Sequence, residues 1–206
     1  MLKVGLTGGI ASGKSTVAYM LRERDCQVLE ADPLGHELLE PGQSAYDEVV
    51  REFGNGILGP GDKVDRPKLG AIIFADAAKR TRLNQILHPR ILQVVRQWFA
   101  SLERAGGFDF AVVEAALIVE AEFHKELDKL VVCWCAPEQQ LARLIERGLT
   151  PEEARQRIAA QMPVDQKRAL ADIVIDCSGP IDDTEKQVEA LVAKFHRTAV
   201  AEGNKS

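Results

Sequence analysis

Gly8-Gly9-Ile10-Ala11-Ser12-Gly13-Lys14-Ser15-Thr16 is the stretch that decides the fold of this 206-residue chain. It matches the pattern G-x-x-x-x-G-K-[ST]. An apolar run over residues 4–7 precedes it, and apolar residues at helical spacing follow it over residues 17–21. This strand, loop and helix context predicts a phosphate-binding loop rather than a glycine-rich turn that only caps an ordinary helix.

The loop's backbone predicts how phosphate is bound. Gly8, Gly9 and Gly13 can take positive φ and carry no Cβ, so that successive N–H groups converge on phosphate oxygens at the positive end of the next helix. We expect the nucleotide to contact Gly8, Gly9, Ala11, Ser12, Gly13, Lys14, Ser15 and Thr16.

Side chains of the same stretch predict ATP and Mg²⁺ as ligands. Lys14 supplies a mobile positive charge that reaches the β and γ phosphates. Ser15, and less directly Thr16, offers a hydroxyl to Mg²⁺, which requires hard oxygen ligands and bridges those phosphates. Ser15 is therefore the candidate metal ligand.

Composition limits the class of protein. The formal charge of −5 gives no general attraction to nucleic acid, and 46% hydrophobic residues are enough for a large core. We find no signal peptide at the N-terminus and no apolar run of about 18 residues. A soluble cytoplasmic protein is the simplest interpretation.

Four cysteines, Cys26, Cys133, Cys135 and Cys177, lie at or beside predicted strands. Cys133 and Cys135 are two residues apart, which places them on one face of a strand and not in a C-x-x-C metal hook. We favour buried thiols over metal ligands.

The remaining apolar runs predict a parallel sheet. Strands are expected at residues 27–29, 110–113, 130–135 and 173–175, and apolar side chains on both faces are typical of a sheet covered by helices on both sides. Asp32 follows the first of these strands and Glu114 the second, at the edge where α/β sheets bind ligands.

Helices are expected between these strands. Asp65 and Asp76 are candidate caps for a largely helical stretch over residues 66–104, with a break at His88-Pro89. Thr150-Pro151-Glu152-Glu153 has the pattern of a capping box.

Cations are concentrated over residues 143–168, on two predicted helices joined by Gly148, where they suit a lid that excludes water. We expect Arg143 and Arg147, one turn apart, to act on the nucleotide. A solvated helix surface is favoured for Arg155, Arg157, Lys167 and Arg168.

Several segments in succession resemble the dephospho-CoA kinase family. They are Thr7 to Thr16, Glu30-Ala31-Asp32, Glu40-Pro41-Gly42, Phe53-Gly54, Asp65-Arg66, Leu83-Asn84 with His88-Pro89, Gln140-Leu141-Ala142-Arg143 with Arg147, Gln161, and Ala171-Asp172 leading to Asp176 and Gly179. The loop alone is shared by many NTPases, whereas this succession is specific and covers nearly the whole chain.

The resemblance implies an α/β fold, a P-loop kinase-type three-layer sandwich with a parallel sheet. It implies one domain: a core of about residues 1–32, 107–137 and 170–200, a helical acceptor-binding insertion of about 33–105, and a lid of about 138–169. The implied reaction transfers the γ-phosphoryl group of ATP to the 3′-hydroxyl of dephospho-CoA, with dephospho-CoA as the small-molecule partner and a monomer or weak homo-oligomer as the assembly.

The resemblance also implies roles for individual residues. Asp32 matches the presumed base for the acceptor hydroxyl, although it is also suited to orient metal-bound water. Arg143 and Arg147 match arginines around the nucleotide and lid, with Lys14, Asp32 and Arg143 as the catalytic set. Arg66 and His88 match positions on the acceptor side.

Carboxylates near the loop leave two alternatives open. Glu114 is suited to hold water on Mg²⁺ or to remain a solvated group at a strand end, and Glu120 is treated in the same way with less support.

Some positions depart from the family pattern. Ala11 stands where glycine is usual, and alanine is tolerated there only if φ is negative. Glu30 replaces an aspartate, and Glu114 and Ala116 replace an aspartate and a proline. Cys177 stands where an asparagine often lies near adenine, so we expect the backbone there to contact the base.

Other functions remain to be separated. A different small-molecule or nucleotide kinase would share the loop, the lid and Asp32, and differ in its acceptor. A regulatory GTPase is disfavoured because no N-K-x-D segment follows a late strand. A pure nucleotide-binding module would turn over nothing.

Overall fold

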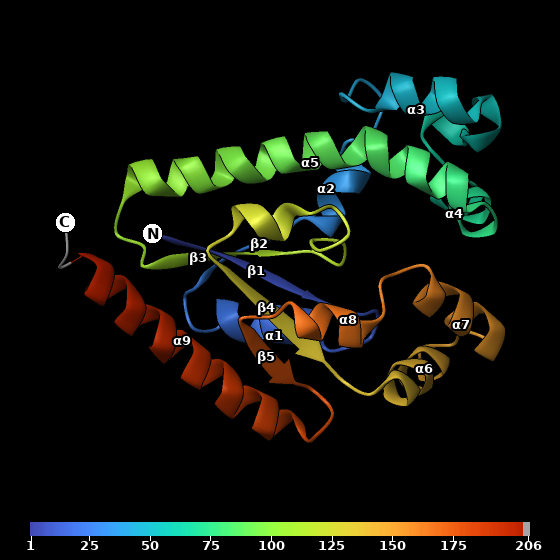
Figure 1. Ribbon diagram of the computed structural model, residues 1–206. Helices are drawn as coiled ribbons and strands as arrows, with labels where there is room; N and C mark the ends of the chain where they lie inside the picture. The colour runs from blue at the N-terminus through green and yellow to red at the C-terminus, as the bar shows by residue number, and fades with distance from the viewer. Residues whose placement is uncertain (204–206) are drawn as a thin grey trace. The chain divides into compact units, whose positions relative to one another are not determined.

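The structure, a computed structural model, describes the backbone of residues 1–203 and the side chains of residues 1–198 (Figure 1). Strands and helices alternate at both ends of the chain, and helices alone fill the stretch between β2 and β3. The elements are β1 Leu2–Gly8, α1 Lys14–Arg22, β2 Gln27–Glu30, α2 Asp32–Glu37, α3 Tyr46–Phe53, η1 Asn55–Ile57, η2 Pro60–Asp62, α4 Arg66–Ala75, α5 Ala77–Ala105, β3 Phe110–Glu114, η3 Phe123–Glu126, β4 Lys129–Trp134, α6 Pro137–Glu146, α7 Pro151–Ala159, α8 Val164–Ala169, β5 Ile173–Asp176 and α9 Ile181–Gly203.

A parallel sheet forms the centre of the chain, in the order β2-β3-β1-β4-β5. β1 is the middle strand and pairs with β3 on one side and β4 on the other, with Leu2 opposite Phe110 and Val4 opposite Lys129. The predicted parallel sheet is confirmed. Because β1 leads directly into the predicted phosphate loop, that loop begins at the carboxyl end of the most central strand.

Helices α1 and α9 cover one face of this sheet (Figure 1). Apolar side chains from both helices, among them Val17 and Phe195, pack on alternate residues of the strands, such as Val4 and Val131. The opposite face contacts α8 and the segment after β3, where Leu127 and Ile118 lie against Gly5. The layering agrees with the expected three-layer α/β sandwich.

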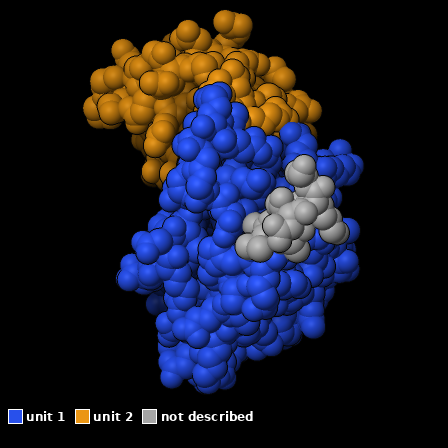
Figure 2. Space-filling view, turned by 90° about the vertical axis from the view of Figure 1, so that its left-hand side faces the viewer, with its two compact units in different colours: residues 1–30, 98–206 blue, residues 31–97 orange. Residues whose placement is uncertain are grey.

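The chain divides into two compact units, shown in separate colours in Figure 2. One contains residues 1–30 and the chain from residue 98 onward, and so carries the sheet, the phosphate loop and helices α6 to α9. The other contains residues 31–97, with helices α2 to α4 and most of α5.

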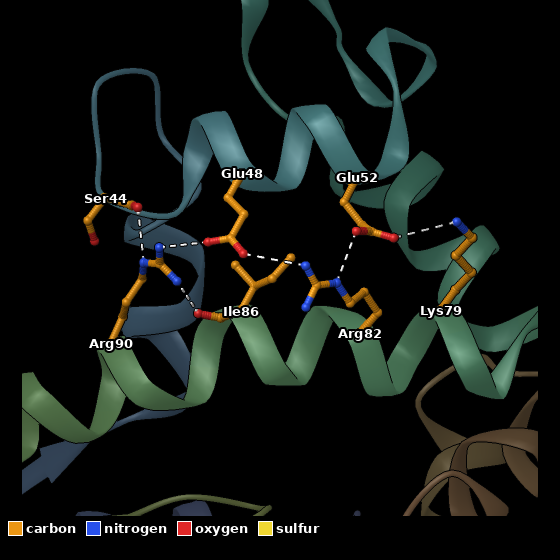
Figure 3. Close-up of polar contacts among 7 residues, drawn as sticks. All are labelled: Ser44, Glu48, Glu52, Lys79, Arg82, Ile86 and Arg90. Atoms are coloured by element: carbon orange, nitrogen blue, oxygen red, sulfur yellow. Dashed lines mark hydrogen bonds and ion pairs between the residues drawn. The ribbon is translucent and has the colours of Figure 1, made fainter.

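Within the second unit, α3 is fastened to α5 by a ladder of ion pairs (Figure 3). The Arg90 guanidinium lies 2.8 Å from Glu48, and Arg82 lies 2.9 Å from Glu52 and 3.6 Å from Glu48. Lys79 extends the ladder at 3.9 Å from Glu52. These pairs border an apolar cluster that includes Val49, Ile57, Leu69, Leu83 and Ile86.

The predicted break at His88-Pro89 is wrong, because α5 continues through Pro89. Proline lacks the N–H that would donate to the carbonyl oxygen of Gln85, and one residue further on Arg90 Nη1 donates to the carbonyl oxygen of Ile86 at 2.6 Å. Burial also continues through the proline, with Ile86 before it and Val95 after it both 1% exposed. Packing therefore outweighs the local cost of proline in this helix.

The predicted helix caps hold, and one helix was not predicted. Asp65 Oδ1 accepts from the N–H of Lys68 at 3.2 Å, and Thr150 and Glu153 form the predicted capping box. Helix α8 was not predicted, because it has six residues and little apolar periodicity. In the part of the chain that the structure describes, no helix is both long and apolar enough to span a bilayer.

Candidate active site

The loop between β1 and α1 has the form expected for binding phosphate. Gly13 is the N-cap of α1 with φ of 97°, and an added Cβ there would lie 2.8 Å from Cys177 Cβ. Gly8 has no positive φ, but its Cβ would lie 2.6 Å from the carbonyl oxygen of Cys133 in β4. Of the three glycines that can take positive φ, Gly8, Gly9 and Gly13, Gly13 alone has it.

Ala11 is the second left-handed residue of the loop, with φ of 59°. The condition that alanine is tolerated there only with a negative φ is therefore wrong. The turn over residues 9–12 is closed by the N–H of Ser12 donating to the carbonyl oxygen of Gly9 at 3.2 Å, and Arg143 Nη1 donates to the Ala11 carbonyl oxygen at 3.1 Å. These contacts hold the alanine in a backbone conformation that costs an L-residue about 1–2 kcal/mol.

Lys14 and Glu114 form an ion pair beside the loop. The Lys14 side chain is 12% exposed and that of Glu114 is 3% exposed, so the pair is largely withdrawn from water. The alternative that Glu114 is a solvated carboxylate at a strand end is therefore wrong. Ser15 and Thr16, in contrast, are exposed in the first turn of α1.

Side chains from the predicted lid reach the loop directly. The carbonyl oxygen of Ile10 accepts from Gln140 Nε2 at 2.8 Å, and the N–H of Ile10 donates to Gln161 Oε1 at 2.9 Å. Both polar groups of one loop residue are thus held by glutamines that are distant in sequence. Gln140 and Gln161 belong to the segments that resemble the kinase family, and no role was predicted for either.

Arg143 lies at the same place. Its Nη1 donates to the carbonyl oxygen of Ala11, and its Nη2 donates to the carbonyl oxygen of Cys177 at 2.6 Å. The guanidinium therefore joins the loop to the end of β5, and it occupies a main-chain oxygen that we expected to be available to the base. Arg147, at the end of α6, is exposed.

Lys167 is wholly buried, so the solvated surface expected for it is wrong. Its ammonium pairs with Glu120 at 2.8 Å and donates to the carbonyl oxygen of Ala116 at 2.6 Å. Nearby cations behave differently, since Arg155 is 63% exposed and the Arg168 guanidinium lies 4.5 Å from the centroid of the Trp134 ring.

The cysteines are free thiols, and three of them are buried around the loop. Cys133 and Cys177 interact with each other, and this hydrogen bond lowers the pKa of Cys177, whereas burial raises that of Cys133. Cys26 is partly exposed, and burial raises its pKa to about 11. Cys177 packs against Gly13, so its side chain helps to hold the phosphate loop in position.

A second polar cluster lies in the unit of residues 31–97. Asp32 begins α2, two residues beyond the end of β2, and His36 follows one turn later. Arg66 Nη2 lies 2.9 Å from His36 Nε2. Burial and the charge of Arg66 lower the pKa of His36, and Asp32 opposes them.

His36 is a residue that the sequence analysis missed. A single histidine on a short helix has no motif around it, and its contact with Arg66 crosses 30 positions of sequence. His88, the other predicted acceptor-side residue, lies within α5 immediately before Pro89.

The loop residues fit a nucleotide phosphate chain. The first amides of a helix have no partner within the helix, and those of α1 follow a residue in left-handed conformation with Lys14 beside them. Among the described side chains, the buried hydroxyl of Ser12 makes no hydrogen bond. No group of three or more His, Cys, Asp or Glu side chains within this part of the chain suits a metal ion. A Mg²⁺ ion beside Ser15 would take its other ligands from phosphate and water.

Comparisons with known proteins agree with this geometry. Residues 2–183 match the family model described as dephospho-CoA kinase. The chain is 42% identical over 200 residues to "Dephospho-CoA kinase" of Arabidopsis thaliana, covering 94% of this chain and 84% of that protein. It is 44% identical over 192 residues to the protein of the same name from Geobacter sulfurreducens, covering 93% and 97%.

The fold is also found in a solved structure, that of TT1252 from Thermus thermophilus. It is 29% identical to this chain, with a TM-score of 0.78 over 94% of this chain and 97% of that one.

Proposed function

The chain belongs to the dephospho-CoA kinase family and is an ATP-dependent kinase, and we propose that the residues described above carry out its reaction. In that reaction the γ-phosphoryl group of ATP is transferred to the 3′-hydroxyl of dephospho-CoA, which gives coenzyme A and ADP. The observation that supports the residue assignment best is the loop itself, with Gly13 capping α1 and Lys14 beside it at the end of the central strand.

Phosphate binding is assigned to the loop. The amides at the start of α1 and the hydroxyl of Ser12 donate to phosphate oxygens. Lys14 leaves its ion pair with Glu114 and contacts the β and γ phosphates instead. Phosphoryl transfer has a loose transition state with little bond formation to assist. Positioning and charge neutralisation therefore supply most of the catalysis.

Ser15 is the residue that would hold Mg²⁺, and Glu114 is the carboxylate near the loop that would assist it. Mg²⁺ supplies charge neutralisation on the β and γ phosphates. Glu120 is not proposed for this role, because its carboxylate pairs with Lys167 and accepts from the N–H of Met162 at 2.9 Å.

Asp32 is proposed as the group that accepts the proton of the acceptor hydroxyl. It follows the last residue of β2 by two positions in the chain, and α/β proteins bind ligands beyond the carboxyl ends of such strands. Arg66 and His88 are proposed to bind dephospho-CoA, with His36 orienting Arg66. The region of about 33–105 is the proposed acceptor-binding insertion.

Arg143 and Arg147 are proposed to act on the nucleotide from a lid of about residues 138–169. Arg143 serves through its contacts with Ala11 and Cys177, which keep the loop next to the end of β5. Arg147, on an exposed helix end, is free to meet the phosphates when the lid closes. We further propose a cytoplasmic monomer or weak homo-oligomer that binds neither nucleic acid nor membrane.

ADP release from Mg-ATP tests this proposal, measured with and without dephospho-CoA and with adenosine, AMP and pantetheine as alternative acceptors. Dephospho-CoA should give the highest kcat/KM, and Lys14→Ala should lose turnover. Preference for one of the other acceptors would favour the alternative, another small-molecule kinase with the same core.

Asp32→Asn tests the assignment of the base, with Asp47→Asn, an exposed carboxylate of α3, as the matched control. The active-site variant should retain nucleotide affinity and lose turnover, and the control should retain both. Turnover of Asp32→Asn within threefold of wild type would remove the base assignment.

A further inference from the structure

Lys167 is a completely buried lysine that the reaction described above does not use. It lies in α8, on the face of the sheet opposite α1. Its Nζ pairs with Glu120 Oε1 at 2.8 Å, donates to the carbonyl oxygen of Ala116 at 2.6 Å, and lies 3.5 Å from the carbonyl oxygen of Gly8.

Burial of an ammonium group is costly unless the group is paired and hydrogen-bonded. At Lys167 the partners come from two segments that are far from it in sequence, one at residue 8 and the other at residues 116 and 120. An apolar side chain of similar length would fill the same space without requiring those partners. The polar arrangement therefore calls for an explanation beyond packing.

The carbonyl oxygens around Lys167 belong to the first residue of the phosphate loop and to the segment after β3, which lies beside the loop. Gly8 is the last residue of β1 and the first of the phosphate loop. Ala116 lies two residues beyond Glu114, the partner of Lys14, and its carbonyl oxygen also accepts from Thr7 Oγ1 at 3.2 Å. The ammonium thus fixes the entry to the loop against the segment that follows β3.

Glu120 extends the same network to the lid. Its Oε1 also accepts from the N–H of Met162, and the neighbouring Gln161 holds the N–H of Ile10 at the top of the loop. Lys167 therefore holds Glu120, Glu120 holds the main chain at Met162, and this keeps the neighbouring Gln161 in contact with the loop.

We propose that Lys167 is a positioning residue of the kinase, which holds the phosphate loop in its nucleotide-binding conformation through the Gly8 carbonyl and the Glu120 to Gln161 connection. This inference rests on the proposed role of the loop in binding phosphate. It assigns to Lys167 no contact with substrate.

The decisive variant is Lys167→Met with Glu120→Gln. Methionine fills the space of the lysine stem, and glutamine removes the unpaired charge while its amide oxygen still accepts from Met162. Lys129→Met is the matched control, because Lys129 forms an exposed pair with Asp172 at 3.6 Å at the start of β4.

Calorimetric titration with ADP, steady-state kinetics and thermal melting are measured on each protein. We expect the double variant to melt close to wild type, to bind ADP at least tenfold more weakly and to lose at least tenfold in kcat. Its KM for dephospho-CoA should stay within twofold of wild type, because the proposed acceptor-binding residues Arg66 and His88 make none of the contacts of Lys167 and Glu120 described above. Lys129→Met should match wild type in every measurement.

A folded double variant that binds ADP within twofold of wild type overturns the inference and leaves Lys167 as a structural residue. Should the double variant fail to fold, Lys167→Arg decides. Arginine retains the charge opposite Glu120, but its planar fork does not reproduce the contacts of a compact ammonium. ADP affinity should then fall at least threefold, and unchanged affinity would again overturn the inference. Failure of the wild-type protein to bind ADP would instead overturn the proposed function and this inference with it.

Discussion

Replacing Ala11 by glycine should stabilise the protein, although glycine normally destabilises. Ala11 has φ of 59° in the turn over residues 9–12, a region that L-residues occupy at a cost of about 1–2 kcal/mol. The contact between Arg143 and position 11 is made through the main-chain carbonyl oxygen, so glycine keeps it. The substitution removes one partly exposed methyl group and the strain on the backbone.

The magnitude follows from two opposing terms. Glycine relieves the left-handed strain of about 1–2 kcal/mol, and its greater freedom in the unfolded chain costs about 0.5–1 kcal/mol. The difference lies between about 0 and 1.5 kcal/mol, and we take a central gain of about 0.5–1 kcal/mol in the free energy of unfolding. For a chain of this size we expect the melting temperature, followed by circular dichroism, to rise by about 1–4 °C.

Ala142→Gly is the matched control, because Ala142 is an exposed residue within α6. The same change there should lower the melting temperature, since glycine in a helix costs about 0.5–1 kcal/mol relative to alanine. If Ala11→Gly lowers the melting temperature as much as the control does, the left-handed conformation at Ala11 is not present in solution and the reasoning fails.

Three further predictions concern single side chains. Glu114→Gln should lower the melting temperature of the nucleotide-free protein, because Lys14 loses a charge partner, at a cost of up to about 3 kcal/mol in the free energy of unfolding. ADP should restore part of this loss. Equal melting temperatures of the variant and the wild type without ADP would contradict the prediction. Burial and the charge of Arg66 lower the pKa of His36 in the folded protein, so the unfolded chain binds a proton at this histidine at a higher pH than the folded chain does. The contribution of His36 to stability is therefore present above the ordinary histidine pKa of about 6.5 and is lost as the pH falls. The decline in melting temperature between pH 7 and 5.5 should therefore be smaller in His36→Gln, and an identical decline would refute it. Asp65→Ala should cost about 1 kcal/mol by removing the cap of α4, measured as a lower melting temperature, and no change would show that the cap is dispensable.

Two of the differences between prediction and structure concern charged residues. Lys167 was assigned to a solvated surface, because a lysine in a polar stretch is exposed in most proteins. It is buried because three oxygens from other segments surround it, and nothing within its own helix indicates their presence. Glu114 was left between two roles for the same reason, since its partner Lys14 lies on a different strand's loop.

The sequence alone determined the parallel sheet, the phosphate loop and the family. Each depends on short-range information, namely the apolar runs of the strands, the spacing of Gly8, Gly13 and Lys14, and the order of motifs along the chain. Helix caps such as Asp65 were predictable on the same grounds, because a cap is made within four residues.

Only the tertiary structure decided the conformation of Ala11, the continuity of α5 through Pro89, and the partners of Lys167 and His36. These depend on which distant groups the fold brings together: the ammonium of Lys167 and the carbonyl of Gly8 are 159 residues apart in the chain and 3.5 Å apart in space. Burial and pairing at such distances are properties of the packed core, and local residue patterns do not encode them.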